Sequence, residues 1–280
     1  MTSNPDPTAG LAVGKSAPAV RMDRFVRPDA RTQGAPSQDG RPQDGRPQRV
    51  MPLMRKIEVA CLSASGSDLS FSRLVPALGV FEDAFAAFSR STLLTTARGL
   101  IAVGDLWPGD MLRTVGNGFQ PLLWKGATMV VPQARDQDPA MGRLTRIAAD
   151  ALGIARPMHD LILGPRARLT QRGPGIRTLT GADAALIPAR DFIDGDQVIE
   201  ITPATPVQVF HLGLGTHDRV LAQGVEVETM HPGPAHAVPL RGDMLALYLS
   251  CFPHMPDLAA FGPLCLPRLR MQDLDLFNVA

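Results

Sequence analysis

The 280-residue sequence has little of what several common classes of protein depend on. Aromatic residues make up 5 % of it, with Tyr248 as the single tyrosine, so a stacking platform for single-stranded nucleic acid is not expected. The formal net charge is +1, which gives no electrostatic case for nucleic acid or an anionic membrane as partner. No stretch approaches the roughly 18 consecutive apolar residues of a membrane-spanning helix. We therefore expect no nucleic-acid partner and no membrane span.

Metal-binding patterns are also missing. The three cysteines, Cys61, Cys251 and Cys265, lie far apart and lack the spacing of metal ligands, so we interpret them as reduced thiols. The histidines are equally scattered. His211 and His217 fall near one predicted strand, but no second pair completes a zinc site. We predict no metal site and no cofactor.

The first part of the chain is poor in large apolar residues. It contains a short tandem repeat, QDGRP, at residues 38–42 and 43–47. Such a segment cannot bury enough surface to offset the entropy lost on ordering, and we predict a disordered tail over residues 1–54. Residues 1–20 lack the basic head and apolar core of a secretory signal, so the cytoplasm is the default expectation for location.

After this tail the pattern changes to short apolar and β-branched runs separated by turn residues, which is typical of an all-β domain. Pro108-Gly109-Asp110 predicts a tight turn, and Gly116-Asn117-Gly118 predicts a hairpin. The expected strands cover residues 55–62, 91–96, 100–103, 111–115, 120–126, 127–131, 160–163, 207–214 and 219–227. Two helices are expected. One covers residues 143–152, ended by Gly153, and the other covers residues 243–250, with Asp243 as N-cap.

One eight-residue pattern occurs twice. It occurs at residues 105–112 (DLWPGDML) and 191–198 (DFIDGDQV). Both copies have an aspartate and an apolar residue at the start, Gly-Asp at the fifth and sixth positions, and an apolar residue at the end. A repeated β module predicts a pseudo-twofold domain. Its aspartates are expected to bond amides of their own turns rather than to bind a metal; they are Asp105, Asp110, Asp191 and Asp196.

These segments resemble a known family. Residues 87–96 (AFSRSTLLTT) and 103–112 (VGDLWPGDML) are similar to the start of a Hint domain, the hedgehog/intein family, in its bacterial non-intein branch. Residues 122–126, 186–198 and 209–227 resemble its following strand, second module and closing hairpin. The resemblance covers residues 85–233 and implies an all-β, horseshoe-like fold with pseudo-twofold symmetry. Residues 55–84 then form a lead-in, and residues 234–280 a C-terminal cap with a short helix.

The family activity that this resemblance implies is self-processing. A first-position Cys or Ser attacks the preceding carbonyl, a Thr-x-x-His element activates that bond, and a later His completes cleavage. Here the first position is Ala87, and the activating His falls on Ala167. A terminal His-Asn pair would fall near Glu228-Thr229 and is absent. Of the family's reactive residues, only the late His has a match, His217.

Two interpretations of function remain. In the first, the domain has lost autoprocessing, is not an enzyme, and serves as a scaffold or binding module for an unidentified protein partner. His217 is then a relic proton donor or a turn histidine that bonds its own backbone. In the alternative, the protein cleaves or splices itself with Ser91 or Ser89 as nucleophile, although serine before a strand is more often a turn or cap residue. An unrelated enzyme lacks support, because no phosphate loop, metal spacing or serine-triad signature is present.

Overall fold

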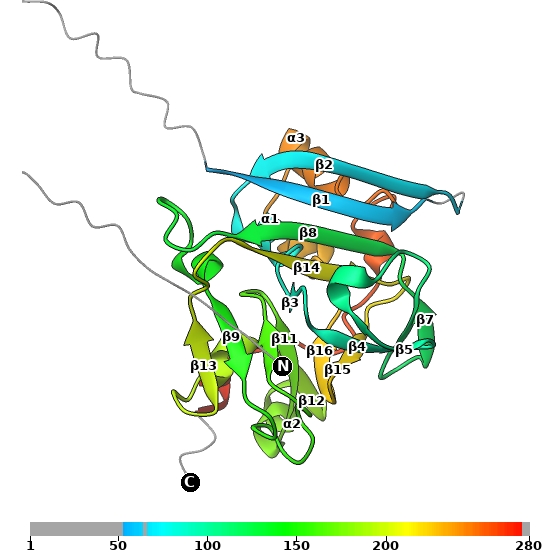
Figure 1. Cartoon of the computed structure of the whole chain (residues 1–280). Coiled ribbons are helices and arrows are strands. Elements are labelled where there is room, and N and C mark those ends of the chain that lie inside the picture. Colours follow the sequence, from blue (N-terminus) through cyan, green and yellow to red (C-terminus); the bar gives the residue numbers. More distant parts are fainter. Residues whose placement is uncertain (1–52, 64–65, 276–280) are drawn as a thin grey trace, which may run out of the picture. The chain divides into compact units, whose positions relative to one another are not determined.

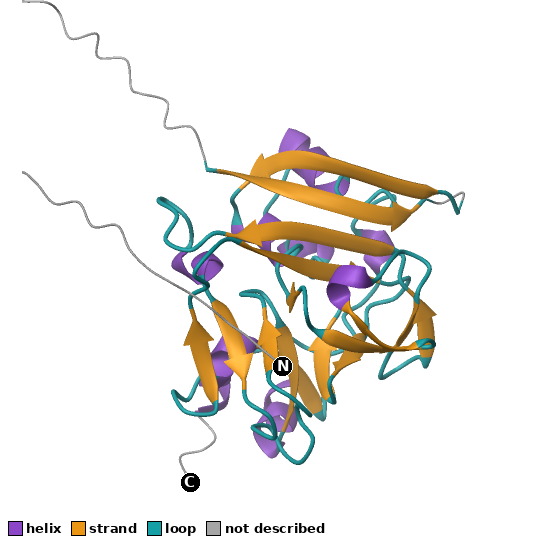
Figure 2. Cartoon of the chain, in the orientation of Figure 1, coloured by secondary structure: helices purple, strands orange, loops and turns teal. Residues whose placement is uncertain are grey.

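The computed structural model describes residues 53–63 and 66–275. Nearly all of the tail predicted for residues 1–54 lies outside these described residues. The described part is mostly β and contains two antiparallel sheets of eight strands each (Figure 2). The all-β prediction is confirmed.

The first sheet has the strand order β13-β9-β10-β3-β14-β8-β1-β2. Its strands are β1 (Met54–Leu62), β2 (Asp68–Pro76), β3 (Phe88–Ser89), β8 (Trp124–Val130), β9 (Leu144–Ile147), β10 (Leu161–Leu163), β13 (Val198–Ile201) and β14 (Val207–Gly213). Ile57 pairs with Thr128 and Cys61 with Trp124 where β1 runs beside β8. The lead-in therefore continues the sheet of the following domain, as the neighbouring β1, β8 and β14 show in Figure 1.

The second sheet has the order β12-β11-β16-β15-β4-β6-β7, with β5 paired to β4. Its strands are β4 (Leu93–Thr96), β5 (Gly99–Ala102), β6 (Met111–Arg113), β7 (Phe119–Pro121), β11 (Arg168–Arg172), β12 (Ala184–Pro188), β15 (Arg219–Ala222) and β16 (Val225–Glu228). The predicted hairpin between β6 and β7 is present, with Gly118 at φ 69°. Gln223 (φ 51°) and Gly224 (φ 90°) form the turn between β15 and β16.

Helices are short in the described part. The α-helices are α1 (Gly79–Asp83), α2 (Pro174–Thr180), α3 (Gly242–Leu249) and α4 (Met271–Asp275), and the 3-10 turns are η1 (Val103–Asp105), η2 (Pro139–Gly142), η3 (Ala189–Phe192), η4 (Ala235–Ala237) and η5 (Ala259–Phe261). The helix predicted over residues 243–250 is therefore present. Its N-cap is Arg241 rather than Asp243, whose charge lies in the first turn, where the helix dipole favours it. Among the described residues, none of the helices combines the length and apolarity that crossing a membrane requires.

The helix predicted over residues 143–152 is wrong. Leu144–Ile147 is the strand β9, which lies between β13 and β10. Ile147 pairs with Val198 on one side and Leu161 on the other. The spacing of Leu144 and Ile147 is that of one helix face, but in the strand the two side chains point to opposite faces and pack in different clusters. Pairing on both sides of β9 favours the strand.

The repeated module is visible in the fold. Strand β5 leads through η1 and a turn at Gly109 (φ 99°) into β6, and β12 leads through η3 and a turn at Gly195 (φ 83°) into β13. Each glycine has a left-handed backbone that other residues rarely adopt. The predicted internal repeat therefore corresponds to two copies of one strand, 3-10 turn and strand unit.

The aspartates of the repeat do not all act as predicted. Asp110 accepts a hydrogen bond from the Trp107 amide at 2.8 Å within its own turn. In the second module Asp194 takes that role, accepting from the amides of Asp196 and Val198. Asp191 instead binds Arg270 across 79 residues. Within the described residues, neither Asp105 nor Asp196 accepts a hydrogen bond from an amide of its turn through its carboxylate.

Two clusters of buried side chains hold together the segments that carry the site. The first joins the two modules and contains Ala87 and Ala167. The second joins β1 and α1 to the C-terminal region, where Trp124 donates from Nε1 to the carbonyl of Cys251 at 2.8 Å. This second core holds the C-terminal segment against the domain. The segment thereby delivers side chains to the site described next.

Candidate functional site

The position of the predicted first residue, Ala87, is fully enclosed. Ala86 and Ala87 are 0 % and 1 % exposed and precede β3. The Ala87 amide donates to the carbonyl of Phe210 at 2.9 Å, and the Ala86 carbonyl accepts from the Arg166 amide at 2.9 Å. The Ala86–Ala87 peptide bond is thus held on both sides by backbone hydrogen bonds.

The turn of residues 164–167 lies directly against this bond. The Gly164 amide donates to the Ala87 carbonyl at 2.7 Å. A Cβ at Gly164 would lie 2.4 Å from the Ala86 carbonyl oxygen, so only glycine fits here. Ala167 is 1 % exposed and packs in the same buried cluster as Ala87. The structure therefore places in one buried cluster the two positions that the family resemblance assigns to the nucleophile and the activating histidine, and both carry a methyl group.

His217 lies between β14 and β15, with its side chain fully buried. Its Nδ1 accepts from the Cys265 amide at 3.0 Å, so in the neutral ring the proton is on Nε2. Nε2 lies 3.1 Å from Oε1 of Glu228, off the line of a directed hydrogen bond. The predicted structural role, bonding to its own backbone, is wrong, because the partner amide belongs to the C-terminal segment. No hydrogen bond joins His217 to Ala86 or Ala87 in the part of the chain that the structure describes.

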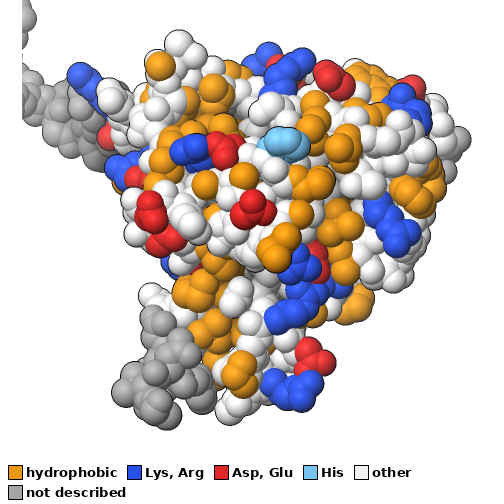
Figure 3. Space-filling model, turned by 60° about the horizontal axis from the view of Figure 1, so that its bottom comes forward, with side chains coloured by type: hydrophobic (Ala, Val, Ile, Leu, Met, Phe, Trp, Pro, Cys, Tyr) orange, Lys and Arg blue, Asp and Glu red, His pale blue; other side chains and the backbone are white. Residues whose placement is uncertain are grey.

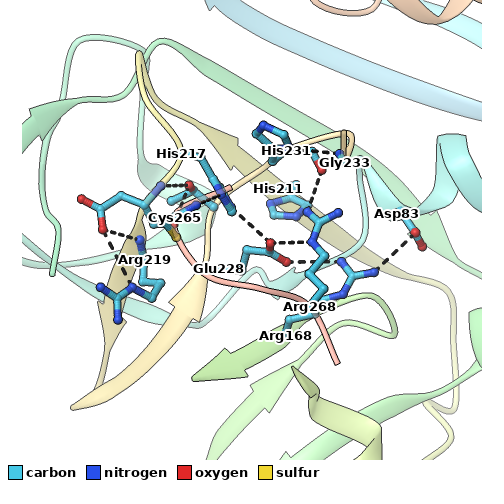
Figure 4. Close-up of polar contacts among 12 residues, drawn as sticks. Asp83, Arg168, His211, His217, Arg219, Glu228, His231, Gly233, Cys265 and Arg268 are labelled. Atoms are coloured by element: carbon cyan, nitrogen blue, oxygen red, sulfur yellow. Dashed lines mark hydrogen bonds and ion pairs between the residues drawn. The ribbon is translucent and has the colours of Figure 1, made fainter. Parts of the chain in front are cut away.

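Glu228, at the end of β16, is the centre of this cluster (Figure 4). It is 1 % exposed, and Oε1 accepts from Nε of Arg268 at 2.8 Å, while Oε2 lies 3.3 Å from a terminal nitrogen of Arg168. Burial alone would raise the pKa of Glu228, but the charge of Arg268, the contact with His217 and the charge of Arg168 hold that pKa well below its usual value. The carboxylate is therefore a fixed anion that orients its neighbours.

Two further histidines pack around it. The His231 ring lies 4.7 Å from that of His217; its Nδ1 accepts from the Gly233 amide at 2.9 Å, and its Nε2 is 3.0 Å from the Gly262 carbonyl. Burial and the neighbouring His217 lower the pKa of His231 to about 4. Burial lowers the pKa of His211 to about 3. Both rings are neutral near pH 7.

The two serines proposed as alternative nucleophiles lie elsewhere. Ser89 Oγ is 3.0 Å from Oγ1 of Thr92, which donates to the Ile162 carbonyl at 3.0 Å. Ser91 is exposed, and its Oγ is 3.4 Å from that of Ser89. Within the described residues, neither hydroxyl contacts a histidine or carboxylate that could take its proton. Neither serine therefore has a base beside it.

Sequence analysis missed Glu228, Arg268 and His231 as members of one site. Their signal is weak, because 40 residues separate Glu228 from Arg268 and only the second core brings them together. No group of three or more His, Cys, Asp or Glu side chains suited to a metal ion occurs among the residues described. Burial raises the pKa of the nearby Cys265 thiol to about 11, which disfavours the reactive thiolate.

Comparison with known proteins finds similar solved structures and one family model. The solution structure of a bacterial intein-like domain from Clostridium thermocellum shares 11 % identity with a TM-score of 0.37, covering 52 % of this chain and 99 % of that one. A glutathione-linked, splice-inactive variant of the AceL NrdHF class 3 split intein shares 10 % identity with a TM-score of 0.35, covering 51 % and 97 %. No curated protein matches. The sequence model of the Hint domain matches residues 86–234, more than half of the chain, and the chain therefore belongs to the Hint domain family.

Proposed function

We propose that this chain is a Hint domain that no longer processes itself and that serves as a scaffold or binding module. One observation carries the proposal. The family places its nucleophile and its activating histidine at Ala87 and Ala167, and here both are methyl groups buried in one apolar cluster. A methyl group can neither attack a carbonyl nor donate a proton, so both chemical roles are vacant.

The surroundings support a retained fold rather than a retained reaction. The Ala86–Ala87 bond takes part in ordinary backbone pairing with Phe210 and Arg166. His217, the one reactive residue that the family pattern preserves, accepts a hydrogen bond from the Cys265 amide at Nδ1, and its Nε2 lies 3.1 Å from Glu228. These contacts give His217 a packing role that does not depend on catalysis.

The alternative is self-cleavage or splicing that starts from Ser91 or Ser89. It requires a hydroxyl to attack the carbonyl before it, with a base to accept the hydroxyl proton. The bonding of Ser89 to Thr92 and the exposure of Ser91 do not favour this route. Self-cleavage at either serine would be detected by the test below.

The test is the intact mass of the purified full chain after prolonged incubation, alone and with a thiol or hydroxylamine. An unchanged mass under every condition supports the proposal, because no ester or thioester has formed for the added nucleophile to cleave. A fragment that begins at Ala87, Ser89 or Ser91 contradicts it. The variants Ser89→Ala and Ser91→Ala then assign the nucleophile, since the responsible substitution abolishes the fragment.

A further inference from the structure

Five arginine side chains line one hollow beside the turn of residues 164–167. Arg166 and Arg168 flank Ala167, Arg190 comes from η3, and Arg268 and Arg270 come from the segment before α4. The hollow measures about 280 Å³, and its wall contains two carboxylates, those of Asp83 and Asp273. Four further carboxylates contact these arginines from outside the lining, those of Glu82, Asp138, Asp191 and Glu228.

The gathering of arginines is local. In the face drawn in Figure 3, basic, acidic and apolar side chains are interspersed, without a broad field of one sign. The whole chain has a net charge of only +1. A long-range attraction to a polyanion is therefore not expected, whereas a small anion that enters the hollow meets several guanidinium groups at once.

Carboxylates behind the wall hold most of these arginines in place. Arg166 donates to Glu82 and Asp138, each at 2.7 Å. Arg270 makes two hydrogen bonds to Asp191, at 2.7 and 2.8 Å, and Arg268 binds Glu228. Side chains already fixed in this way lose little further entropy when a ligand arrives.

Some donors in the wall remain without an acceptor. The side chain of Arg190, which is half-buried, has no hydrogen bond or ion pair with any of the described residues. Nε of Arg166 is buried, and although it lies 3.4 Å from Asp83, no acceptor takes its proton. Buried donors are nearly always satisfied in folded proteins. The buried Nε of Arg166 is an exception, and it points to an acceptor that comes from outside the chain.

We propose that this hollow binds a phosphate group, free or esterified to a small molecule. The inference rests on the proposed function, because it names the ligand class of the binding module. Guanidinium groups from separate segments surround the space, which suits the tetrahedral oxygens of a dianion better than the single plane of a carboxylate. The hollow also opens on Ala167, where the family places its activating histidine.

The test is isothermal titration of the full chain in phosphate-free buffer with inorganic phosphate, glycerol 3-phosphate and succinate. We expect a dissociation constant of roughly 1 mM or below for a phosphate probe and weaker binding of succinate. Arg190→Gln should weaken phosphate binding about tenfold, the usual effect of one charge-assisted hydrogen bond, and Arg190→Lys should restore part of it. Arg177→Gln is the control, because Arg177 lies on α2, pairs with Asp183 and does not line the hollow.

The two phosphate probes show whether the natural ligand is a phosphate ester or the free ion. Tighter binding of glycerol 3-phosphate favours an ester, and tighter binding of inorganic phosphate favours the free ion. Absence of heat with both probes overturns the inference, as does equal binding by the Arg190→Gln and Arg177→Gln variants. Succinate binding as tight as phosphate also overturns it. Failure of phosphate binding in a chain that keeps its intact mass counts against the phosphate site alone. Self-cleavage counts against the proposed function, whatever the titration shows.

Discussion

Glu228 and Arg268 form a 2.8 Å hydrogen-bonded ion pair that ties the C-terminal segment to the last strand of the Hint domain. The Glu228 side chain is 2 % exposed and that of Arg268 21 %. Arg168 approaches the other oxygen of the same carboxylate. One anion thus holds two cations from different parts of the chain, which makes it a sensitive point for stability.

Replacing Glu228 with Gln should destabilise the protein strongly. The variant keeps the shape of the side chain but leaves Arg168 and Arg268 without their counter-charge, and breaking a buried pair in this way costs about 3 kcal/mol. Urea unfolding at pH 7 measures the effect. Asp183→Asn, which removes an exposed partner of Arg177, is the control and should leave the unfolding free energy unchanged. Equal stability of the two variants would refute the role given to Glu228.

Stability should fall as the pH is lowered from 7 to 5. The folded pKa of His211 is about 3 and that of His231 about 4, both below the ordinary value of about 6.5 for an unfolded histidine. Between these values the unfolded chain binds more protons, so lowering the pH favours unfolding. The stability that each neutral buried histidine contributes is fully present at a pH above its unfolded pKa, and it is lost as the pH falls towards its folded pKa. For His211 the loss at pH 5 is about 2 kcal/mol.

The variant His211→Gln tests this pH effect. Urea unfolding at pH 7 and pH 5 should show a smaller difference for His211→Gln than for the natural chain, because one buried titrating ring is gone. His159, an exposed histidine, provides the matched variant His159→Gln, which should keep the natural difference. An unchanged difference in His211→Gln would show that another group causes the acid sensitivity.

Gly164→Ala should be among the most damaging single-methyl additions. The new Cβ would lie 2.4 Å from the Ala86 carbonyl oxygen, and backbone must move to admit it, at a cost of about 3 kcal/mol. Gly79→Ala is the control, since a Cβ at Gly79 meets nothing within 4 Å. Thermal or urea unfolding of the two variants measures the difference. Similar midpoints would argue against the tight contact between this turn and the Ala86–Ala87 bond.

Ala87→Cys alone should restore a thiol but no cleavage, because no histidine at position 167 activates the bond. Ala167→His adds that ring at a position that lines the neighbouring hollow. We expect thiol-dependent cleavage before position 87 only in the variant with both substitutions, measured as a fragment mass. Cleavage by Ala87→Cys alone would show that activation does not need position 167.

Much of the β architecture could be predicted from local pattern. Runs such as Leu93–Thr96 and Val207–Gly213 are β-branched or apolar between turn residues, and they form strands. The helix expected over residues 143–152 failed because the spacing of Leu144 and Ile147, typical of one helix face, belongs here to a strand that is buried on both faces. Pairing with two other strands, invisible in a local window, settled the outcome.

The polar site was harder to predict for a different reason. Along β16, alternation suggests that Glu228 faces solvent like Glu226, but Glu228 is buried. It is buried because Arg268 reaches it from a segment held by the second core. The alanines at positions 87 and 167 were found from family spacing, since an alanine by itself gives no chemical signal.

The most direct test of the central claim is the intact mass of the natural chain after long incubation with hydroxylamine. The account predicts a single species at the full mass, because neither Ala87 nor Ala167 can support ester or thioester formation at the Ala86–Ala87 bond. A product whose new N-terminus is Ala87 would contradict the account, and so would one that begins at Ser89 or Ser91.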